Sequence, residues 1–296
     1  MNLLITGAWQ SAKENIGKIE QMGHVVSFCQ YEKDELPCEY EWVEGVICNG
    51  LFLYHPIERF SNLKYIQLTS AGFDRVPMEY VKEHDIEIHN ARGVYSIPMA
   101  EFAVSGVLQL YKQASYFREN QKLHRWEKHR GLKELYGKTV CIVGCGSVGT
   151  ECAKRFQAFG CNVIGIATSE REQLYFDEVK AADTLDEVLV RADVVVLTVP
   201  LAEDTWHMID EERFEKIKNG AILVNIARGA IVDGNALEKA LDGRLGGAVL
   251  DVFEEEPLSA DSPLWNKGNV IITSHNSFVG EGNQERLCHT IFSNME

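Results

Sequence analysis

The sequence of 296 residues predicts an α/β protein made of two doubly wound parallel sheets. Short apolar segments alternate with amphipathic segments along most of the chain, which is the pattern of strands joined by helices that cover both faces of a sheet. This alternation starts once at residue 2 and again near residue 138, so a complete α/β unit precedes a second one. A hydrophobic content of 45% with 25% charged residues is typical of globular domains.

The first series supplies five strand candidates and two helical stretches. Residues 11–22 and 77–83 have helical spacing. The strand candidates read NLLIT, HVVSF, GVICN, KYIQLT and IEIHN. The series ends near Pro98, which a helix tolerates in its first turn. The apolar run after Pro98 reaches about residue 118 and is too apolar on all sides for a surface helix. We therefore expect this helix to lie between domains or subunits.

The second series has strands that are apolar almost without interruption, as expected where both faces of a sheet are buried. A helix is predicted over 148–159, with Gly160 as its stop signal. The strand candidates read TVCIV, VIGIA, DVVVLTV, AILVNI, GGAVLDVF and NVIITS.

Charge and cysteine usage exclude several classes of protein. The net charge of −15 disfavours binding to nucleic acid or to an anionic membrane. The first residues lack the basic segment and long apolar run of a signal peptide, and no later segment approaches the ~20 apolar residues of a membrane span. The eight cysteines form no CxxC pair and fall mostly in apolar elements. We therefore expect reduced, buried thiols, a cytoplasmic protein and no metal site.

A glycine motif of the nucleotide-binding type follows the strand TVCIV. In GCGSVG, Gly144 permits a tight turn, Gly146 lets a pyrophosphate approach the backbone, and Gly149 lets the next helix pack closely on the strand. The phosphate would rest at the helix N-terminus around Ser147 and Val148, where N–H groups and the helix dipole favour anions. Because a strand precedes the motif and a helix follows it, the sequence predicts a dinucleotide site and not an ordinary strand–turn–helix.

The strand after this motif ends without the acid that binds the ribose in NAD enzymes of this fold. Ala167 stands at its end, Thr168 and Ser169 offer hydroxyl groups, and Arg171 offers a guanidinium suited to phosphate. The sequence therefore favours NADP, with NAD as the second possibility. Glu170 is the contrary observation, because its carboxylate would serve the ribose of NAD if it turned inward.

Polar residues follow three later strands, and open α/β sheets bind ligands at the carboxyl ends of their strands. Arg228 lies just past the end of AILVNI, Asp251 lies near the end of GGAVLDVF with Glu256 beyond it, and His275 follows NVIITS. Simpler explanations exist for each residue type. An arginine here could bind helix-end carbonyls, Asp251 could cap a turn, and the run of three acids that includes Glu256 is typical of a solvated surface.

At these residues the sequence resembles the D-isomer-specific 2-hydroxyacid dehydrogenase family, over essentially the whole chain. Seven segments occur in the order and spacing of the family, namely SAGFDRVP, IPMAE, GCGSVG, VPLAEDT, NIARGAIVD, DVFEEEPL and SHNS. The resemblance implies a flavodoxin-like substrate domain, residues 1–97 with 275–296, and an inserted Rossmann NAD(P)-binding domain, residues 98–274. It also implies hydride transfer between NAD(P)H and a small 2-oxo acid, as in phosphoglycerate dehydrogenases and glyoxylate–hydroxypyruvate reductases.

The resemblance also implies roles for individual residues. Arg228 binds the substrate carboxylate and carbonyl, His275 is the acid/base, and Glu256 pairs with the imidazole. In the substrate domain, the substrate carboxylate is held by the backbone N–H groups of Ser70, Ala71 and Gly72. Besides the glycine motif and the loop after Ala167, the implied cofactor contacts are Val199, Pro200, Thr205, Ile226, Ala227 and Asp251. Asp251 should face the nicotinamide carboxamide, and Ser274 stands where the family usually has proline.

Two alternatives stay open beside the enzyme. A nucleotide-sensing corepressor of the same family would retain Arg228, Glu256 and His275 but turn over weakly, although the short N-terminus and the lack of a tail favour a metabolic enzyme. An adenosylhomocysteine hydrolase shares the architecture but carries a larger substrate domain.

Three further expectations concern the oligomeric state, the C-terminal helix and the substrate pocket. We expect a symmetric homodimer built from the helix after Pro98 and the arm around Trp126. The chain ends within the helix that should return to the substrate domain. Phe52, Tyr54 and Phe278 suggest an apolar substrate pocket, but core packing explains aromatic residues equally well.

Overall fold

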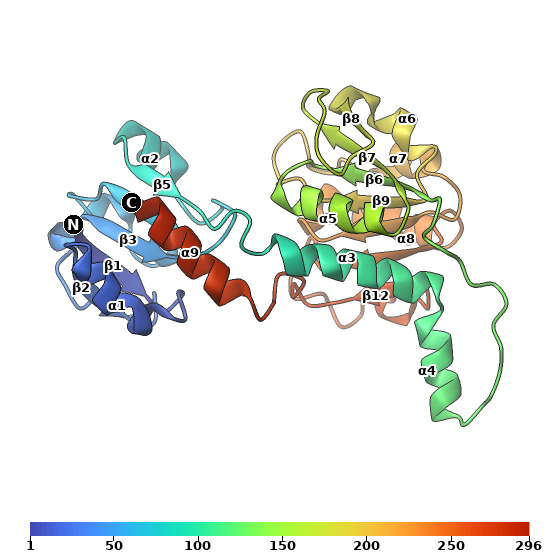
Figure 1. Cartoon of the computed structure of the whole chain (residues 1–296), viewed down its shortest axis with the longest axis horizontal. Coiled ribbons are helices and arrows are strands. Elements are labelled where there is room, and N and C mark those ends of the chain that lie inside the picture. The colour runs from blue at the N-terminus through green and yellow to red at the C-terminus, as the bar shows by residue number, and fades with distance from the viewer. Residues whose placement is uncertain (296) are drawn as a thin grey trace. The chain divides into compact units, whose positions relative to one another are not determined.

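The computed structural model describes residues 1–295, which form two compact α/β units (Figure 1). The first unit contains Met1–Tyr95 and the segment from Gly280 onward, and the second contains Ser96–Val279. All paired strands within each sheet are parallel, which confirms the predicted fold class. The units begin and end a few residues from the predicted boundaries. Hydrogen bonds from residues 275–277 to Asp251 hold the His275 segment to the second unit.

The first unit has a five-stranded sheet in the order β2-β1-β3-β4-β5, which is the flavodoxin-like order. Its strands are β1 (Asn2–Thr6), β2 (Val25–Cys29), β3 (Gly45–Cys48), β4 (Tyr65–Leu68) and β5 (Glu87–His89). Its helices are α1 (Ala12–Gln21), α2 (Met78–Glu83) and α9 (Asn283–Met295). Leu287 and Ile291 of α9, red in Figure 1, are buried in the same apolar cluster as Leu3 and Ile5 of β1. The last described helix therefore returns to the first unit.

The second unit has a seven-stranded sheet in the order β12-β11-β10-β9-β6-β7-β8. Its strands are β6 (Thr139–Val143), β7 (Asn162–Ala167), β8 (Glu178–Ala181), β9 (Val194–Leu197), β10 (Ile222–Asn225), β11 (Gly247–Leu250) and β12 (Val270–Ile272). Its helices are α3 (Ser96–Tyr111), α4 (Ala114–Lys122), α5 (Ser147–Ala158), α6 (Leu185–Leu189), α7 (Glu211–Lys216) and α8 (Gly234–Leu241). This is the Rossmann strand order with one added strand, and the order reverses between β6 and β9.

Helix α3 differs in part from the expectation that it lies between domains or subunits. It packs on α5, β10 and β11 of its own unit. A Cβ at Gly106 would come within 2.6 Å of the Val249 side chain, so the helix lies directly on the sheet. Its apolar character is therefore largely explained by burial on its own sheet. In Figure 1, α4 and the loop that follows it project away from the rest of the second unit.

The cysteines are free thiols, and six of the eight are buried. Burial raises the pKa of Cys152 and Cys141 to about 12. None of the helices in residues 1–295 has the length and apolar character needed to cross a membrane.

Candidate active site

The glycine motif between β6 and α5 has a different steric constraint at each glycine. Gly144 has φ +103, and a Cβ there would lie 2.9 Å from backbone atoms of Thr198 and Val199. A Cβ at Gly149 would lie 2.0 Å from the Gly144 carbonyl oxygen, so α5 sits against the turn. A Cβ at Gly146 would meet no protein atom within 4 Å. These are the constraints of a tight turn, close packing and open space for a pyrophosphate.

The N-terminus of α5 is suited to bind the anion. Gly146 is the N-cap residue and has extended backbone, and no side chain caps the helix. The N–H groups of the first turn, at Ser147 and Val148, have no capping side chain as an acceptor, and the helix dipole favours negative charge beside them. The residues present therefore fit the pyrophosphate of a dinucleotide.

The loop after β7 places Arg171 beside the glycine motif through a residue that the sequence did not single out. Strand β7 ends at Ala167, and Thr168 and Ser169 are exposed. The Arg171 Nε donates to Oε1 of Gln173 at 3.0 Å, and Nε2 of Gln173 donates to the Cys145 carbonyl at 2.9 Å. Gln173 lies in an irregular segment without any motif, so no sequence signal marked it.

In the loop after β9, the side chain of Thr205 bonds to the backbone of the same loop. The Thr205 hydroxyl donates to the Pro200 carbonyl at 2.8 Å and accepts from the Ala202 N–H at 2.7 Å. Thr205 is buried, Pro200 is exposed and Val199 is half-buried at the reversal of strand order. Thr205 therefore fixes the shape of this loop, and its contact with cofactor stays a prediction.

The turn after β10 carries Arg228, whose Nη1 donates to the Ala227 carbonyl at 2.7 Å. Asn225 is buried at the end of β10, where its amide donates to the Arg228 carbonyl at 2.9 Å and its Oδ1 accepts from Ala227 N–H at 3.1 Å. Ile226 and Ala227 are buried between them. The turn packs tightly on the next loop, because a Cβ at Gly229 would come within 1.8 Å of the Phe253 carbonyl carbon.

The histidine and the acid predicted as its partner form a pair. His275 Nδ1 and Glu256 Oε2 are 2.8 Å apart. The second carboxylate oxygen of Glu256 accepts from the Phe253 N–H at 3.0 Å, which anchors the acid to the loop that packs on Gly229. Contacts therefore link the turn of Arg228 with the Glu256–His275 pair within one unit. A carboxylate on Nδ1 favours the tautomer with its proton there and leaves Nε2 for exchange with a ligand.

Asp251 is more deeply buried than the sequence suggested. It is 0% exposed, and its carboxylate accepts from Thr273 Oγ1 at 2.6 Å, Asn276 N–H at 2.8 Å and Ser277 N–H at 2.9 Å. Burial alone would raise the pKa of Asp251, but hydrogen bonds from Ser277, Thr273 and Asn276 hold this pKa below its usual value.

These bonds fix the segment after β12. His275 itself has φ +49 and donates its N–H to the Asp251 carbonyl at 2.8 Å. Asp251 therefore sets the shape of the loop that carries His275 and Ser274, and a contact of its carboxylate with nicotinamide stays a prediction.

Glu254 is a second residue that the sequence did not single out. Its Oε2 lies 3.0 Å from His207 Nε2, and its Oε1 accepts from the Gly234 N–H at 2.9 Å. The run of three acids is thus not a uniform solvated surface, because Glu254 and Glu256 each hold a defined partner. Glu254 attaches the loop of Glu256 to the start of α8.

In the first unit, the predicted carboxylate-binding segment follows β4. Among the described residues, the N–H groups of Ser70, Ala71 and Gly72 have no acceptor within hydrogen-bond distance. The Asn90 amide donates to the Ala71 carbonyl at 2.6 Å, and the Tyr95 hydroxyl donates to the Thr69 carbonyl. The carbonyls of this segment are therefore occupied while three successive N–H groups remain to bind an anion.

Comparison with known proteins identifies the family. Residues 104–277 match the family model described as "D-isomer specific 2-hydroxyacid dehydrogenase, NAD binding domain".

This chain belongs to the D-isomer specific 2-hydroxyacid dehydrogenase family.

It is similar to a glyoxylate reductase of Korarchaeum cryptofilum, with 32% identity over 80% of this chain and 74% of the relative. It is 38% identical to a D-3-phosphoglycerate dehydrogenase of Methanocaldococcus jannaschii over 74% of this chain, which covers 42% of that longer protein. The dehydrogenase is therefore an NAD(P)-dependent oxidoreductase, and the comparisons do not support the corepressor alternative.

Solved structures of related proteins are similar to this structure over nearly the whole chain. A family member from Aeromonas salmonicida superimposes with a TM-score of 0.86 at 32% identity, covering 99% of this chain and 94% of that one. A D-lactate dehydrogenase from Aquifex aeolicus, complexed with NAD and lactic acid, gives 0.80 at 26% identity, covering 99% and 94%. A family member from Xanthobacter autotrophicus, in complex with NADPH, gives 0.80 at 25% identity with the same coverages. Solved relatives thus include complexes with either cofactor.

Proposed function

We propose that this dehydrogenase reduces a small 2-oxo acid to the D-2-hydroxy acid, with Arg228, Glu256 and His275 as its catalytic residues. The observation that carries the proposal is the Glu256–His275 pair at 2.8 Å, on a loop packed against the turn of Arg228. A guanidinium binds a carboxylate and an adjacent carbonyl through parallel N–H bonds.

The Glu256–His275 pair also supports a proposal for the proton transfer. When bound, the reduced nicotinamide supplies the hydride. His275 donates the Nε2 proton to the carbonyl oxygen, and Glu256 on Nδ1 stabilises the imidazolium before the transfer. In the reverse direction the neutral imidazole accepts the hydroxyl proton. The first unit contributes the N–H groups of residues 70–72, which we propose bind the substrate carboxylate.

A substrate panel tests this function. Steady-state rates with glyoxylate, hydroxypyruvate and branched 2-oxo acids, each with NADPH and NADH, should include at least one efficient substrate. Poor turnover on every member of the panel would overturn the proposal and favour a binding protein.

We further propose that NADP is preferred over NAD. An acid at the end of the second strand would bind the ribose hydroxyl and repel a 2′-phosphate, and Ala167 does neither. Arg171 lies in the loop just beyond and is tied to the glycine motif through Gln173. Glu170 opposes the proposal, because its carboxylate belongs to the same exposed segment.

The ratio of kcat/KM for NADPH to that for NADH tests the preference. We expect the ratio to exceed one in the wild type and to fall by about 10- to 100-fold in Arg171→Ala, because charge-assisted hydrogen bonds to phosphate are lost. A wild type that prefers NADH, or a ratio that Arg171→Ala leaves unmoved, would contradict it. Glu172→Ala on the same loop is the control.

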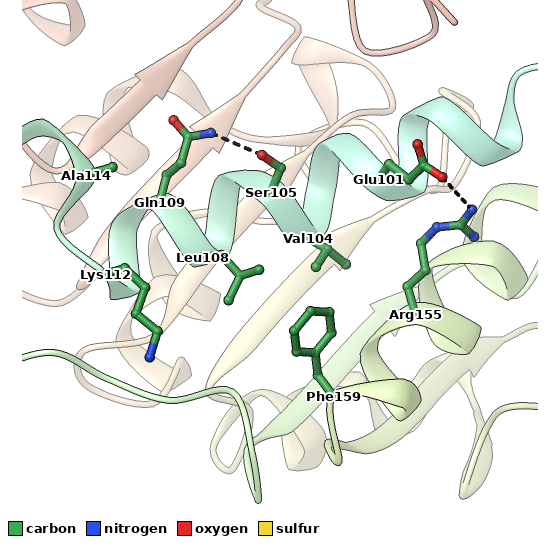
Figure 2. Close-up of a pocket in the computed structure, with 9 residues that line it drawn as sticks. All are labelled: Glu101, Val104, Ser105, Leu108, Gln109, Lys112, Ala114, Arg155 and Phe159. Carbon is green, nitrogen blue, oxygen red and sulfur yellow. Dashed lines mark hydrogen bonds and ion pairs between the residues drawn. The ribbon is translucent and has the colours of Figure 1, made fainter. Parts of the chain in front are cut away.

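We also propose a homodimer that uses α3 and the arm formed by residues 114–136. Trp126 on the arm is 98% exposed, and Phe117, Leu123 and Leu132 are exposed near it, which is unusual for apolar side chains in contact with water alone. A groove beside α3 offers an apolar floor. Figure 2 shows Val104 and Leu108 of α3 facing Phe159 at the end of α5.

Light scattering tests the assembly. We expect twice the mass of 33.4 kDa at micromolar concentration, and a monomer in Trp126→Asp. A wild type that is monomeric would contradict the homodimer. We propose a cytoplasmic location as well, because the free thiols of this chain stay reduced in that compartment.

A further inference from the structure

The side-chain amide of Gln173 has three hydrogen-bond partners in the cofactor-binding unit. Its Nε2 donates to the Cys145 carbonyl and to Thr150 Oγ1, both at 2.9 Å, and its Oε1 accepts from Arg171 Nε at 3.0 Å. This set of partners fixes the orientation of the amide. A reversed amide would set NH2 against the Arg171 N–H and oxygen against the Cys145 carbonyl.

These partners belong to the part of the chain that binds phosphate. Cys145 lies inside the glycine motif, and Thr150, in the first turn of α5, donates to the Gly146 carbonyl at 2.8 Å. The segment after Gln173 is also packed on the sheet, because the side chains of Phe176 and Cys145 occupy the space beside Gly165 of β7. Gln173 therefore joins Arg171 to the glycine motif and to the first turn of α5.

The bond to Arg171 uses only the Nε of the guanidinium. Among the described residues, its two terminal nitrogens make no hydrogen bond or ion pair within the protein. They are the donors that a guanidinium uses for bidentate binding of phosphate. An exposed arginine loses ~2 kcal/mol of rotamer entropy when it is fixed, so a side chain already held at Nε loses less on binding.

We propose that Gln173 is a positioning residue for cofactor selectivity, which orients Arg171 toward the 2′-phosphate of NADP. The inference rests on the proposed preference for NADP. It assigns to Gln173 an effect on the 2′-phosphate alone, whereas a residue that only supported the glycine motif would affect every adenine nucleotide equally.

Calorimetric titration with two probes separates these roles without catalysis. The first probe is 2′,5′-ADP, which carries the 2′-phosphate, and the second is 5′-AMP, which lacks it. We expect Gln173→Ala to weaken the binding of 2′,5′-ADP by about 5- to 10-fold, which corresponds to the loss of one hydrogen bond. The affinity for 5′-AMP should not change. Gln173→Met keeps the length of the side chain without its amide and should give the same result if the alanine variant folds poorly.

Two further variants complete the experiment. Gln157→Ala, an exposed glutamine on α5, is the matched control and should change neither affinity. In an Arg171→Ala background, Gln173→Ala should have no additional effect, because Gln173 acts through the arginine.

The outcomes that overturn the proposal are distinct. An equal loss for both probes, or an additive loss in the double variant, would overturn the positioning role. If Arg171→Ala changes the ratio of the two affinities but Gln173→Ala does not, the positioning role of Gln173 is wrong and the proposed NADP preference is unaffected. If Arg171→Ala does not change this ratio either, both the positioning role and the NADP preference are wrong.

Discussion

Replacing Asp251 with asparagine should damage the second unit and the position of His275 together. The carboxylate is fully buried and accepts hydrogen bonds from Thr273, Asn276 and Ser277. An asparagine of the same shape has one acceptor oxygen, so its NH2 would oppose at least one of these donors. Hydrogen bonds to a charged group contribute ~1.5–3 kcal/mol each, and we expect Asp251→Asn to lower the free energy of unfolding by about 2–4 kcal/mol.

The pKa of Asp251 gives this prediction a pH dependence. The folded-state pKa lies below the unfolded reference of 3.8, so the carboxylate stabilises the fold at pH values above this reference. The stabilisation is lost as the pH falls through the folded pKa, because a protonated Asp251 resembles asparagine. The difference between wild type and variant should therefore be large at pH 7 and smaller near pH 3.

Calorimetric melting with a kinetic readout is the assay. A loss of 2–4 kcal/mol in a domain of this size corresponds to a Tm about 4–16 °C lower at pH 7. A displaced His275 should lower kcat by about 10- to 100-fold. Asp183→Asn, an exposed carboxylate in the same unit, is the control. An unchanged Tm at pH 7, or an equal difference at both pH values, would refute the structural role of Asp251.

Three further predictions concern the proposed mechanism and the glycine motif. His275→Ala should lower kcat by at least ~10²-fold, the contribution of one positioned acid/base, and near-normal turnover in the folded variant would remove His275 from the mechanism. Arg228→Lys should mainly raise the KM for the 2-oxo acid, since an ammonium cannot reproduce the fork, and an unchanged KM would count against its role. Gly146→Ala should leave the Tm unchanged but weaken NADPH binding, whereas Gly149→Ala should lower the Tm by about 2–10 °C because its Cβ meets the Gly144 carbonyl. Thermal melts and fluorescence titration with NADPH distinguish these glycine variants, and equal effects from both would contradict the assignment.

Most strands were predictable because burial on both faces produces runs of apolar residues. The predicted helices at 11–22, 77–83 and 148–159 also agree with α1, α2 and α5. Strand β8 was missed. It lies at the edge of its sheet with the sequence EVKA, and only Val179 is buried, so the apolar signal is weak. The glycine motif was predictable in more detail, because the constraints at Gly144 and Gly149 are local to the backbone.

The partners of polar side chains were harder to predict. Gln173 and His207 gain their partners from loops that follow different strands, and no spacing along the sequence encodes such a contact. Their residue types are also common on protein surfaces. The missing acid was therefore enough to single out the loop after β7 as the proposed selectivity loop, but nothing in the sequence marked Gln173, whose amide accepts a hydrogen bond from Arg171.

Three of the four acids that follow strand β11 illustrate why residue type alone does not assign a role. Asp251, Glu254 and Glu256 lie within six positions, and each would be an ordinary solvated carboxylate on a surface helix. Here the available donors separate them. Buried Asp251 accepts three hydrogen bonds and fixes the loop after β12. Glu254 accepts a hydrogen bond from the Gly234 N–H and contacts His207, which fixes the loop after β11. Glu256 meets the imidazole of His275, whose side chain is 44% exposed against 21% for His207, so Glu256 is the better placed of the two glutamates to stabilise a proton that a ligand could take. The assignment of Glu256 therefore depends on exposure of its partner as much as on distance, since a buried pair would hold its proton out of reach of substrate.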